Sequence, residues 1–216
     1  MTIRPAPPAP FVPTPWHGKL VIGMLVCHSG RDPQTDLAPV RGLGNPIVDL
    51  VMEKPYVAQQ SMLDGAEPKG LNYYWKSEFL PELSTGFLDA FRDDALMAPS
   101  PLSNSVIFHI GGALNERADD DGAVGNRGAR YLTGFAGAWP EGGAGEEQVA
   151  WVREGWKRIR PFSTGGNYVN FQVAEDDSAR IADAYGKNHE RLRRIKASFD
   201  PENLFRVNRN ITPAAS

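Results

Sequence analysis

Gly165-Gly-Asn-Tyr-Val-Asn-Phe171 is the most informative stretch of this 216-residue chain, together with Asn203-Leu-Phe-Arg-Val-Asn-Arg-Asn-Ile211 near its C-terminus. Polar and apolar side chains alternate along the first segment, which predicts a short strand entered through two glycines. That strand would place Tyr168, Asn170 and Gln172 together on one polar face. A phenol beside amide groups offers hydrogen-bond donors and acceptors to a flat polar heterocycle.

Elsewhere the chain alternates predicted strands with predicted helices. Strands are expected where apolar or aromatic runs stand between turn residues, at Lys19–Cys27, Leu71–Phe79, Ser105–Ile110 and Tyr131–Trp139. Helices are expected at Asp36–Arg41 (broken by Pro39), Pro55–Leu63, Ser84–Met97 with Ser84 as N-cap, Glu146–Arg160 and Ser178–Phe199. Gly186 would weaken the last of these helices by about 1 kcal/mol relative to alanine. The stretch Leu114–Arg130 shows no periodicity and is expected to be a loop.

This order of elements contains no repeat and predicts an α+β domain, with a mixed or antiparallel sheet covered by helices on one face. Residues 1–15 hold six of the 18 prolines, so residues 1–16 are expected to be an extended lead-in that joins neither a sheet nor a helix. Residues 17–213 would then form one domain, which is an ordinary size for a single hydrophobic core.

Composition narrows the classes of function. A formal net charge of −3 and a pI near 5.8 give no basic surface for nucleic acid or an anionic membrane. No apolar run approaches the ~20 residues of a membrane span, and residues 1–10 lack the apolar core of a secretion signal. The single cysteine, Cys27, excludes an internal disulfide and suits a reducing compartment. The expected location is therefore cytoplasmic.

Several familiar site motifs are incomplete or absent in this sequence. Arg41–Pro46 contains Gly-x-Gly without the third glycine of a dinucleotide-binding turn, and Pro46 stands where a helix should begin. Asp119–Gly122 lacks the alternating ligands and closing glutamate of a calcium loop. No pair of histidines or cysteines has metal-ligand spacing, and no Gly-x-Ser-x-Gly elbow is present. The sequence therefore predicts no metal site.

Three motifs together resemble the C-terminal signature of the berberine-bridge-enzyme-like FAD-linked oxidases. They are the Tyr-x-Asn of Tyr168–Asn170, Tyr185-Gly-Lys-Asn-His-Glu-Arg-Leu192, and Asp200-Pro-Glu-Asn-Leu-Phe-Arg-Val-Asn-Arg-Asn-Ile211. The resemblance extends over residues 17–213, with a substrate-binding sheet first and the berberine-bridge segment at about 167–213. The flavin-binding domain of the family has no counterpart here. His17, Cys27 and His28 stand in no motif for covalent flavin attachment.

The resemblance implies FAD as cofactor and assigns roles to individual residues. In the family the Tyr-x-Asn strand runs beside the isoalloxazine ring, and Tyr168 would act as the base that takes the substrate's hydroxyl proton. Asn170 would bind the flavin or hold Tyr168 in place. Asn208 and Asn210 are carried over as positions near the flavin, although the family more often has glutamine where this chain has Arg209.

The substrate side of the resemblance involves the earlier strands. Gly111 and Gly112 follow a strand and would allow close approach of the backbone to another strand or to a ligand. His109 would either be a hydrogen-bonded strand histidine or enter the pocket, where it could polarise the substrate or stabilise a reduced-flavin anion. Tyr74 and Lys76 are substrate candidates as well, because a lysine within a sheet is costly to bury without a partner.

Two hypotheses follow for function. The first is part of an FAD-dependent oxidoreductase that oxidises an alcohol, sugar or amine-type carbon, with hydride passing to flavin and then to O₂. Its flavin domain would come from a separate chain or a longer gene. The second is a truncated, non-catalytic domain that serves as a binding or assembly module, for example in a homo-oligomer. The first predicts a large exposed apolar face for the flavin domain, well above a few hundred Å², whereas the second predicts a covered one.

Overall fold

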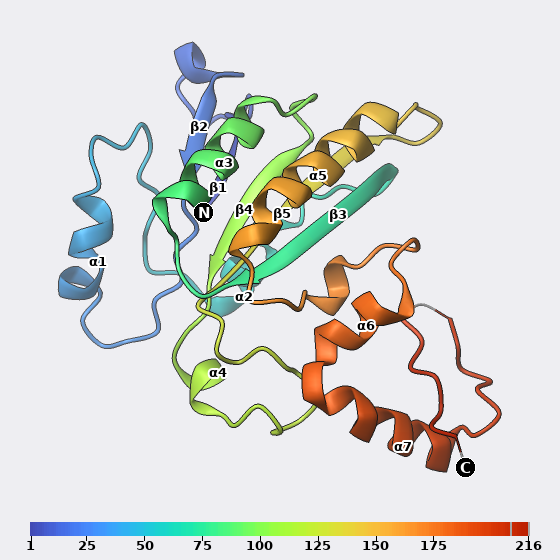
Figure 1. Cartoon of the computed structure of the whole chain (residues 1–216). Coiled ribbons are helices and arrows are strands. Elements are labelled where there is room, and N and C mark those ends of the chain that lie inside the picture. The colour runs from blue at the N-terminus through green and yellow to red at the C-terminus, as the bar shows by residue number, and fades with distance from the viewer. Residues whose placement is uncertain (208, 216) are drawn as a thin grey trace.

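The computed structural model describes residues 1–207 and 209–215. Its centre is a five-stranded sheet of order β2-β1-β4-β5-β3 in which every neighbouring pair is antiparallel (Figure 1). The strands are β1 (Thr2–Pro5), β2 (Leu20–Gly23), β3 (Leu71–Leu80), β4 (Asn104–His109) and β5 (Tyr131–Pro140). The longest pairing joins β3 to β5 over ten residues, which leaves β3 at one edge of the sheet. The predicted α+β class is confirmed.

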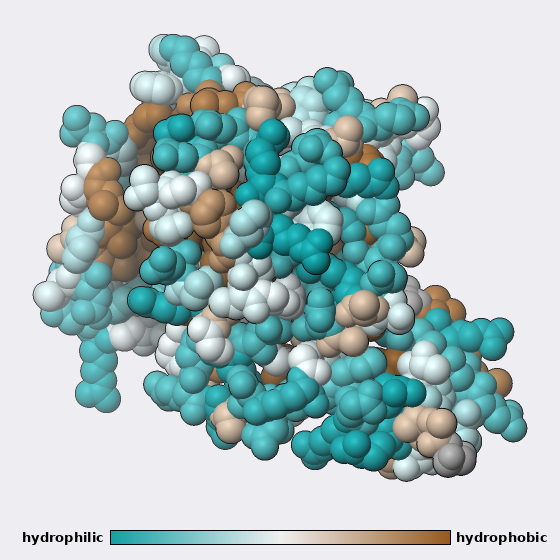
Figure 2. Space-filling view, in the orientation of Figure 1, coloured by the Kyte–Doolittle hydropathy of each residue, from teal (hydrophilic) through white to brown (hydrophobic). Residues whose placement is uncertain are grey.

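Seven α-helices are formed by the described residues, and short 3₁₀ turns join several of them. The α-helices are α1 (Pro33–Arg41), α2 (Tyr56–Gln60), α3 (Thr85–Leu96), α4 (Ala113–Glu116), α5 (Glu146–Ile159), α6 (Ser178–Tyr185) and α7 (His189–Phe199). The 3₁₀ turns are Thr14–Trp16, Ser61–Leu63, Arg160–Phe162, Val169–Phe171 and Gly186–Asn188. In the view of Figure 2, hydrophilic side chains cover α6 and α7, whereas apolar side chains gather between α1 and α3.

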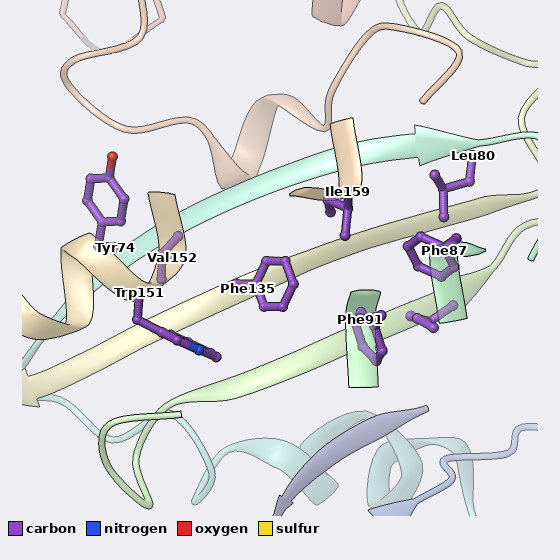
Figure 3. Packing of buried hydrophobic residues seen from close by; sticks show 9 residues of the cluster. Tyr74, Leu80, Phe87, Phe91, Phe135, Trp151, Val152 and Ile159 are labelled. Carbon is purple, nitrogen blue, oxygen red and sulfur yellow. The ribbon is translucent and has the colours of Figure 1, made fainter. Parts of the chain in front are cut away.

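The core lies between the sheet and the two long helices α3 and α5, which lie side by side on the same face (Figure 1). We call this the helix-covered face. Figure 3 shows the side chains that fill the core. Its buried side chains come from both layers: Leu80, Phe87, Phe91, Ile107, Phe135, Trp151, Val152 and Ile159. The α3 helix begins as predicted, because the Ser84 side chain accepts a hydrogen bond of 3.3 Å from the Phe87 N–H. On the other side of the sheet, the opposite face, β3 places Trp75, Ser77 and Phe79.

The expectation for residues 1–16 is wrong at Thr2–Pro5. This segment is β1, an inner strand paired with β2 on one side and β4 on the other. Proline occupies only its last position, so Ile3 and Arg4 keep the backbone N–H groups that a ladder needs. The Met1 amino group also donates to the Ile107 carbonyl at 2.8 Å.

The predicted strand at Gly165–Phe171 is also wrong. Gly165 and Gly166 adopt positive φ values of 85° and 76°, which turn the chain away from an extended path. The following residues form the 3₁₀ turn Val169–Phe171 rather than a ladder. The segment still runs along the outer edge of β3, because the Thr164 N–H donates to the Phe79 carbonyl at 3.1 Å and the Tyr168 N–H to Ser77 Oγ at 3.4 Å.

Four further expectations about helices, strands and loops are corrected. The single helix predicted over Ser178–Phe199 is two helices, because Gly186 has φ +53° and ends α6. Pro39 lies inside α1 without breaking it. The loop predicted over Leu114–Arg130 begins instead with α4, which ends at Glu116. The strand predicted over Lys19–Cys27 is shorter, at Leu20–Gly23, and lies half exposed at the sheet edge.

Candidate functional site

The turn that carries Tyr168 packs onto the opposite face of the sheet through its aromatic ring. The Phe171 ring stacks on Trp75 of β3, with centroids 4.6 Å apart and planes inclined by 14°. Phe108 of β4 lies 6.2 Å from the same ring, and Tyr168 meets it edge-on at 5.1 Å. These four residues form what we call the aromatic cluster: Trp75, Phe108, Tyr168 and Phe171. Phe108 is 44% exposed and Tyr168 38% exposed, so the cluster faces outward as well as inward.

Tyr168 and Asn170 lie side by side, although on a turn rather than a strand. The Asn170 amide nitrogen donates to the Tyr168 hydroxyl oxygen at 2.7 Å. The hydrogen bond fixes the Tyr168 hydroxyl relative to the Asn170 amide. The pair therefore combines a partly exposed hydroxyl with a group that orients it.

The C-terminal tail lies against the same region. The Arg209 guanidinium donates to the carbonyl of Gln172, the residue directly after the turn. Asn210 follows it, and its side-chain oxygen is buried without a hydrogen-bond donor among the described residues. A second part of the tail is held by α7, where the Arg193 carbonyl accepts from the Ala214 N–H at 3.1 Å. Asn208, the other tail position carried over from the family, lies outside the described residues.

Tyr74 and Lys76 lie on the helix-covered face, opposite to the aromatic cluster. The Lys76 side chain is buried and forms ion pairs with Asp176 and, at 3.3 Å, with Glu175. Tyr74 donates its hydroxyl proton to Glu175 and accepts a hydrogen bond of 3.1 Å from Arg153. These contacts join β3 to the segment before α6. The role of both residues toward a substrate stays a prediction.

The pKa values of this group follow from its contacts. Burial and the hydrogen bond to Glu175 raise the pKa of Tyr74 to about 12. Burial opposes ionisation of Glu175 as well, but hydrogen bonds from Arg153, Tyr74 and Lys76 outweigh it and lower the pKa of Glu175 to about 2. The Glu175 carboxylate is therefore charged at neutral pH, and the Tyr74 phenol keeps its proton.

Glu78, which the sequence reasoning passed over, is the most buried charged residue of β3. It is 1% exposed and lies on the same face as Lys76. Its carboxylate accepts hydrogen bonds from Trp156 and Ser163 at 2.6 Å each and pairs with Arg180 at 2.8 Å. A signal was available in the sequence. Lys76 and Glu78 stand between Tyr74 and Leu80 on one face of the predicted strand. Charged side chains at such positions would be buried, and buried charges need partners.

His109, Gly111 and Gly112 form a local arrangement at the end of β4. The His109 ring lies 5.5 Å from that of Tyr131 on the helix-covered side, while its neighbour Phe108 points to the aromatic cluster. A Cβ at Gly111 would lie 3.2 Å from the His109 ring, and Gly112 has φ +59° just before α4. The close approach at Gly111 is thus to a side chain of the same chain. Participation of these residues in substrate binding stays a prediction.

Within residues 1–207 and 209–215, no group of three His, Cys, Asp or Glu side chains could hold a metal ion. None of the helices formed by these residues is long and apolar enough to cross a membrane.

Comparison with known proteins gives the class that the fold and motifs indicate. The family model described as "Berberine and berberine like" matches residues 167–212. An FAD-linked oxidoreductase of Dictyostelium discoideum is 28% identical over 194 residues, which cover 88% of this chain and 42% of that protein. The tetrahydroberberine oxidase of Berberis wilsoniae is 27% identical over 127 residues, covering 51% of this chain and 24% of the relative.

Solved structures agree on the fold. The berberine bridge enzyme of Eschscholzia californica matches 68% of this chain and 34% of its own with a TM-score of 0.59 at 19% identity. CrmK, a flavoenzyme of caerulomycin biosynthesis, matches 74% of this chain and 37% of its own with a TM-score of 0.64 at 25% identity. The chain is thus related to the berberine-bridge-enzyme-like FAD-linked oxidases, as its motifs predict. It spans less than half the length of these relatives.

Proposed function

We propose that this chain is the substrate-binding and C-terminal part of an FAD-dependent oxidoreductase that oxidises an alcohol, sugar or amine-type carbon. The observation that carries the proposal is the 2.7 Å hydrogen bond from Asn170 to the Tyr168 hydroxyl, on an outward-facing aromatic cluster. The FAD-linked oxidoreductases among its relatives support the reaction class.

Two asparagines of the C-terminal part have side-chain oxygens that suit the hydrogen-bond donors of a flavin. The side-chain oxygen of Asn210 is buried and accepts no hydrogen bond from the described residues, so it offers an acceptor to an N–H or O–H group of a ligand. Asn170 keeps its side-chain oxygen for a second partner while its nitrogen contacts Tyr168. Asn170 and Asn210 would therefore hold the cofactor. When bound, FAD supplies the acceptor for a hydride and passes the electrons on to O₂.

In this proposal Tyr168 is the general base. Its oxygen takes the proton of the substrate's hydroxyl or amine group while the adjacent carbon loses a hydride. Asn170 orients the phenol through the hydrogen bond from its amide nitrogen. The edge-on contact with Phe171 fixes the ring plane, which stands at 90° to the Phe171 ring. The exposed side of the aromatic cluster would contact the substrate.

Exposed apolar side chains favour an oxidoreductase part over a self-contained binding module. They occur in two stretches, which include Leu43, Met52, Tyr56 and Val57 in the first and Phe199, Leu204, Phe205 and Val207 in the second. The latter four are each 69–86% exposed. Each stretch is typical of a surface that another domain or a second copy covers. We propose that a flavin-binding domain covers the second stretch.

The test is the visible absorption spectrum of the chain after incubation with excess FAD and desalting. Retained flavin bands are the expected result, either with the chain alone or with the flavin-binding domain present. Asn210→Ala should then retain less FAD, whereas Asn72→Ala, an exposed asparagine at the far end of β3, should retain as much as the wild type.

The role of Tyr168 is tested on the FAD-loaded protein. Tyr168→Phe should retain FAD but reduce it with substrate about 10²-fold or more slowly, as expected for loss of a general base. Equal rates in the two proteins would refute the base assignment. A chain that retains no FAD under either condition would refute the oxidoreductase proposal and support the binding module.

A further inference from the structure

The turn Tyr168–Phe171 is held at both ends by two adjacent residues of the edge strand β3. Ser77 and Glu78 point in different directions, since Ser77 lies on the opposite face and Glu78 on the helix-covered face. The Ser77 carbonyl meanwhile faces outward at the edge of the sheet. A segment that passes over this edge can therefore contact the Ser77 side chain, the Glu78 side chain and the Ser77 carbonyl.

The entering end of the turn is tied to both residues. The Ser163 hydroxyl donates to the Glu78 carboxylate at 2.6 Å, and the Gly165 N–H donates to the Ser163 oxygen at 2.9 Å. The Tyr168 N–H then donates to Ser77 Oγ at 3.4 Å. Two hydrogen bonds therefore link the backbone at Gly165 to a buried carboxylate, and a third ties the backbone of Tyr168 to the neighbouring residue of β3.

The leaving end of the turn is tied to the same residues through Arg180. The Arg180 carbonyl accepts from Gln172 at 3.0 Å and from Asn167 at 2.9 Å. Its guanidinium donates to the Ser77 carbonyl at 2.5 Å and pairs with Glu78 at 2.8 Å. One residue thus joins both flanks of the turn to the strand edge.

We propose that Glu78 and Arg180 are positioning residues for Tyr168, and this rests on the proposed function of Tyr168 as base. The segment lacks the regular hydrogen bonds of a strand, so its position depends on these individual contacts. Glu78 takes part at both ends, because its carboxylate accepts a hydrogen bond from Ser163 on one flank and pairs with Arg180 on the other. Without the charge of Glu78, the Arg180 guanidinium loses its ion pair at the sheet edge. The turn then loses contacts that set its position above Trp75.

The test uses the 216-residue chain labelled with ¹³Cζ-tyrosine, and needs neither FAD nor substrate. Tyr168→Phe assigns one of the six tyrosine signals. In Glu78→Gln we expect the Tyr168 signal to shift and broaden, and the Tyr168 amide to exchange about tenfold faster, as for the loss of a hydrogen bond. The signal of Tyr56, on α2, should not move.

Asp94→Asn is the matched control. Asp94 is another fully buried carboxylate paired with an arginine, Arg158, but it joins α3 to α5 instead of the turn to β3. It should lower stability without moving the Tyr168 signal. Equal shifts in both variants, or none in Glu78→Gln, would overturn the proposal.

Ser163→Ala provides a milder variant in case Glu78→Gln does not fold. It removes one of the bonds to Glu78 and should shift the Tyr168 signal in the same direction by a smaller amount. An unchanged Tyr168 signal in folded Ser163→Ala would likewise contradict positioning through Glu78. Because these readouts involve no flavin, failure of the proposed oxidoreductase activity would leave them unchanged and be recognised separately.

Discussion

Phe171 joins the Tyr168 turn to the sheet through a single ring. It stacks on Trp75 at 4.6 Å and is also in contact with Phe108 and Tyr168. Because the ring is half buried, we expect Phe171→Ala to lower the free energy of unfolding by about 2 kcal/mol, below the range for a fully buried phenylalanine. The tryptophan fluorescence of Trp75 should change as well.

Urea unfolding followed by tryptophan fluorescence measures both effects of Phe171→Ala. Phe199→Ala is the control, because Phe199 is 86% exposed and its removal should change stability by no more than about 0.5 kcal/mol. Similar losses in the two variants would mean that the Phe171 ring does not anchor the turn.

Glu175 makes stability depend on acid pH. Its pKa is lowered from 4.5 to about 2 in the folded chain, so its contribution is fully present above pH 4.5 and is lost as the pH falls toward 2. The side chain is 38% exposed, so solvent screening reduces the contribution to about 1 kcal/mol. Glu175→Gln should therefore flatten the fall in stability between these pH values.

Thermal unfolding from pH 6 to pH 2 checks the role of Glu175. Glu190→Gln removes a more exposed glutamate paired with Arg193 within α7 and serves as the control. If the acid limb of Glu175→Gln superimposes on that of the wild type, the Glu175 contacts do not persist in solution.

At the scale of elements, Gly186 distinguishes one helix from two. In a continuous helix over Ser178–Phe199, Gly186→Ala would stabilise the chain by about 1 kcal/mol. In the structure Gly186 has φ +53° with open space around its Cα, so a methyl group meets no neighbour but strains the backbone. We therefore expect Gly186→Ala to destabilise the chain by about 1 kcal/mol.

The sign of this effect, measured by urea unfolding, answers the question without a further control. A more stable Gly186→Ala variant would indicate that α6 and α7 are continuous in solution. Loss of helical circular dichroism with lower stability would agree with the break.

At the scale of the whole molecule, a buried ion pair joins the C-terminal part to the sheet. Lys76 of β3 and Asp176 both have side chains that are nearly inaccessible, at 6% and 5% exposure. Asp176→Asn leaves the ammonium group with only Glu175 at 3.3 Å, so we expect a loss of about 2 kcal/mol. Lys76→Met combined with Asp176→Leu should recover most of it, because no charge is then left unpaired.

A double-mutant cycle in urea measures this coupling. The exposed pair Lys157–Glu154 on α5 is the control, and its coupling should not exceed about 0.5 kcal/mol. Additive effects at Lys76 and Asp176 would show that the C-terminal part is held by other contacts.

The local sequence pattern was sufficient to predict the strands and helices that pack the core. Strands β3, β4 and β5 and helices α3 and α5 follow from alternation, from helical periodicity and from the Ser84 cap, since each of these signals lies within a few residues of the element it predicts. The motifs of the C-terminal segment were likewise sufficient to predict the relation to the berberine-bridge-enzyme-like oxidases. The residue pair Tyr168 and Asn170 was found in this way, although on a turn.

Pairing between distant segments decided the rest. The segment Thr2–Pro5 is a strand because β2 and β4 lie on either side of it, and the Tyr168 turn is not a strand because two glycines with positive φ precede it. The contact of Arg180 with Ser77 joins residues 103 positions apart, and that of Lys76 with Asp176 joins residues 100 apart. A buried charge in the sequence indicates that a partner must exist, but only the folded chain brings one particular partner within hydrogen-bond distance.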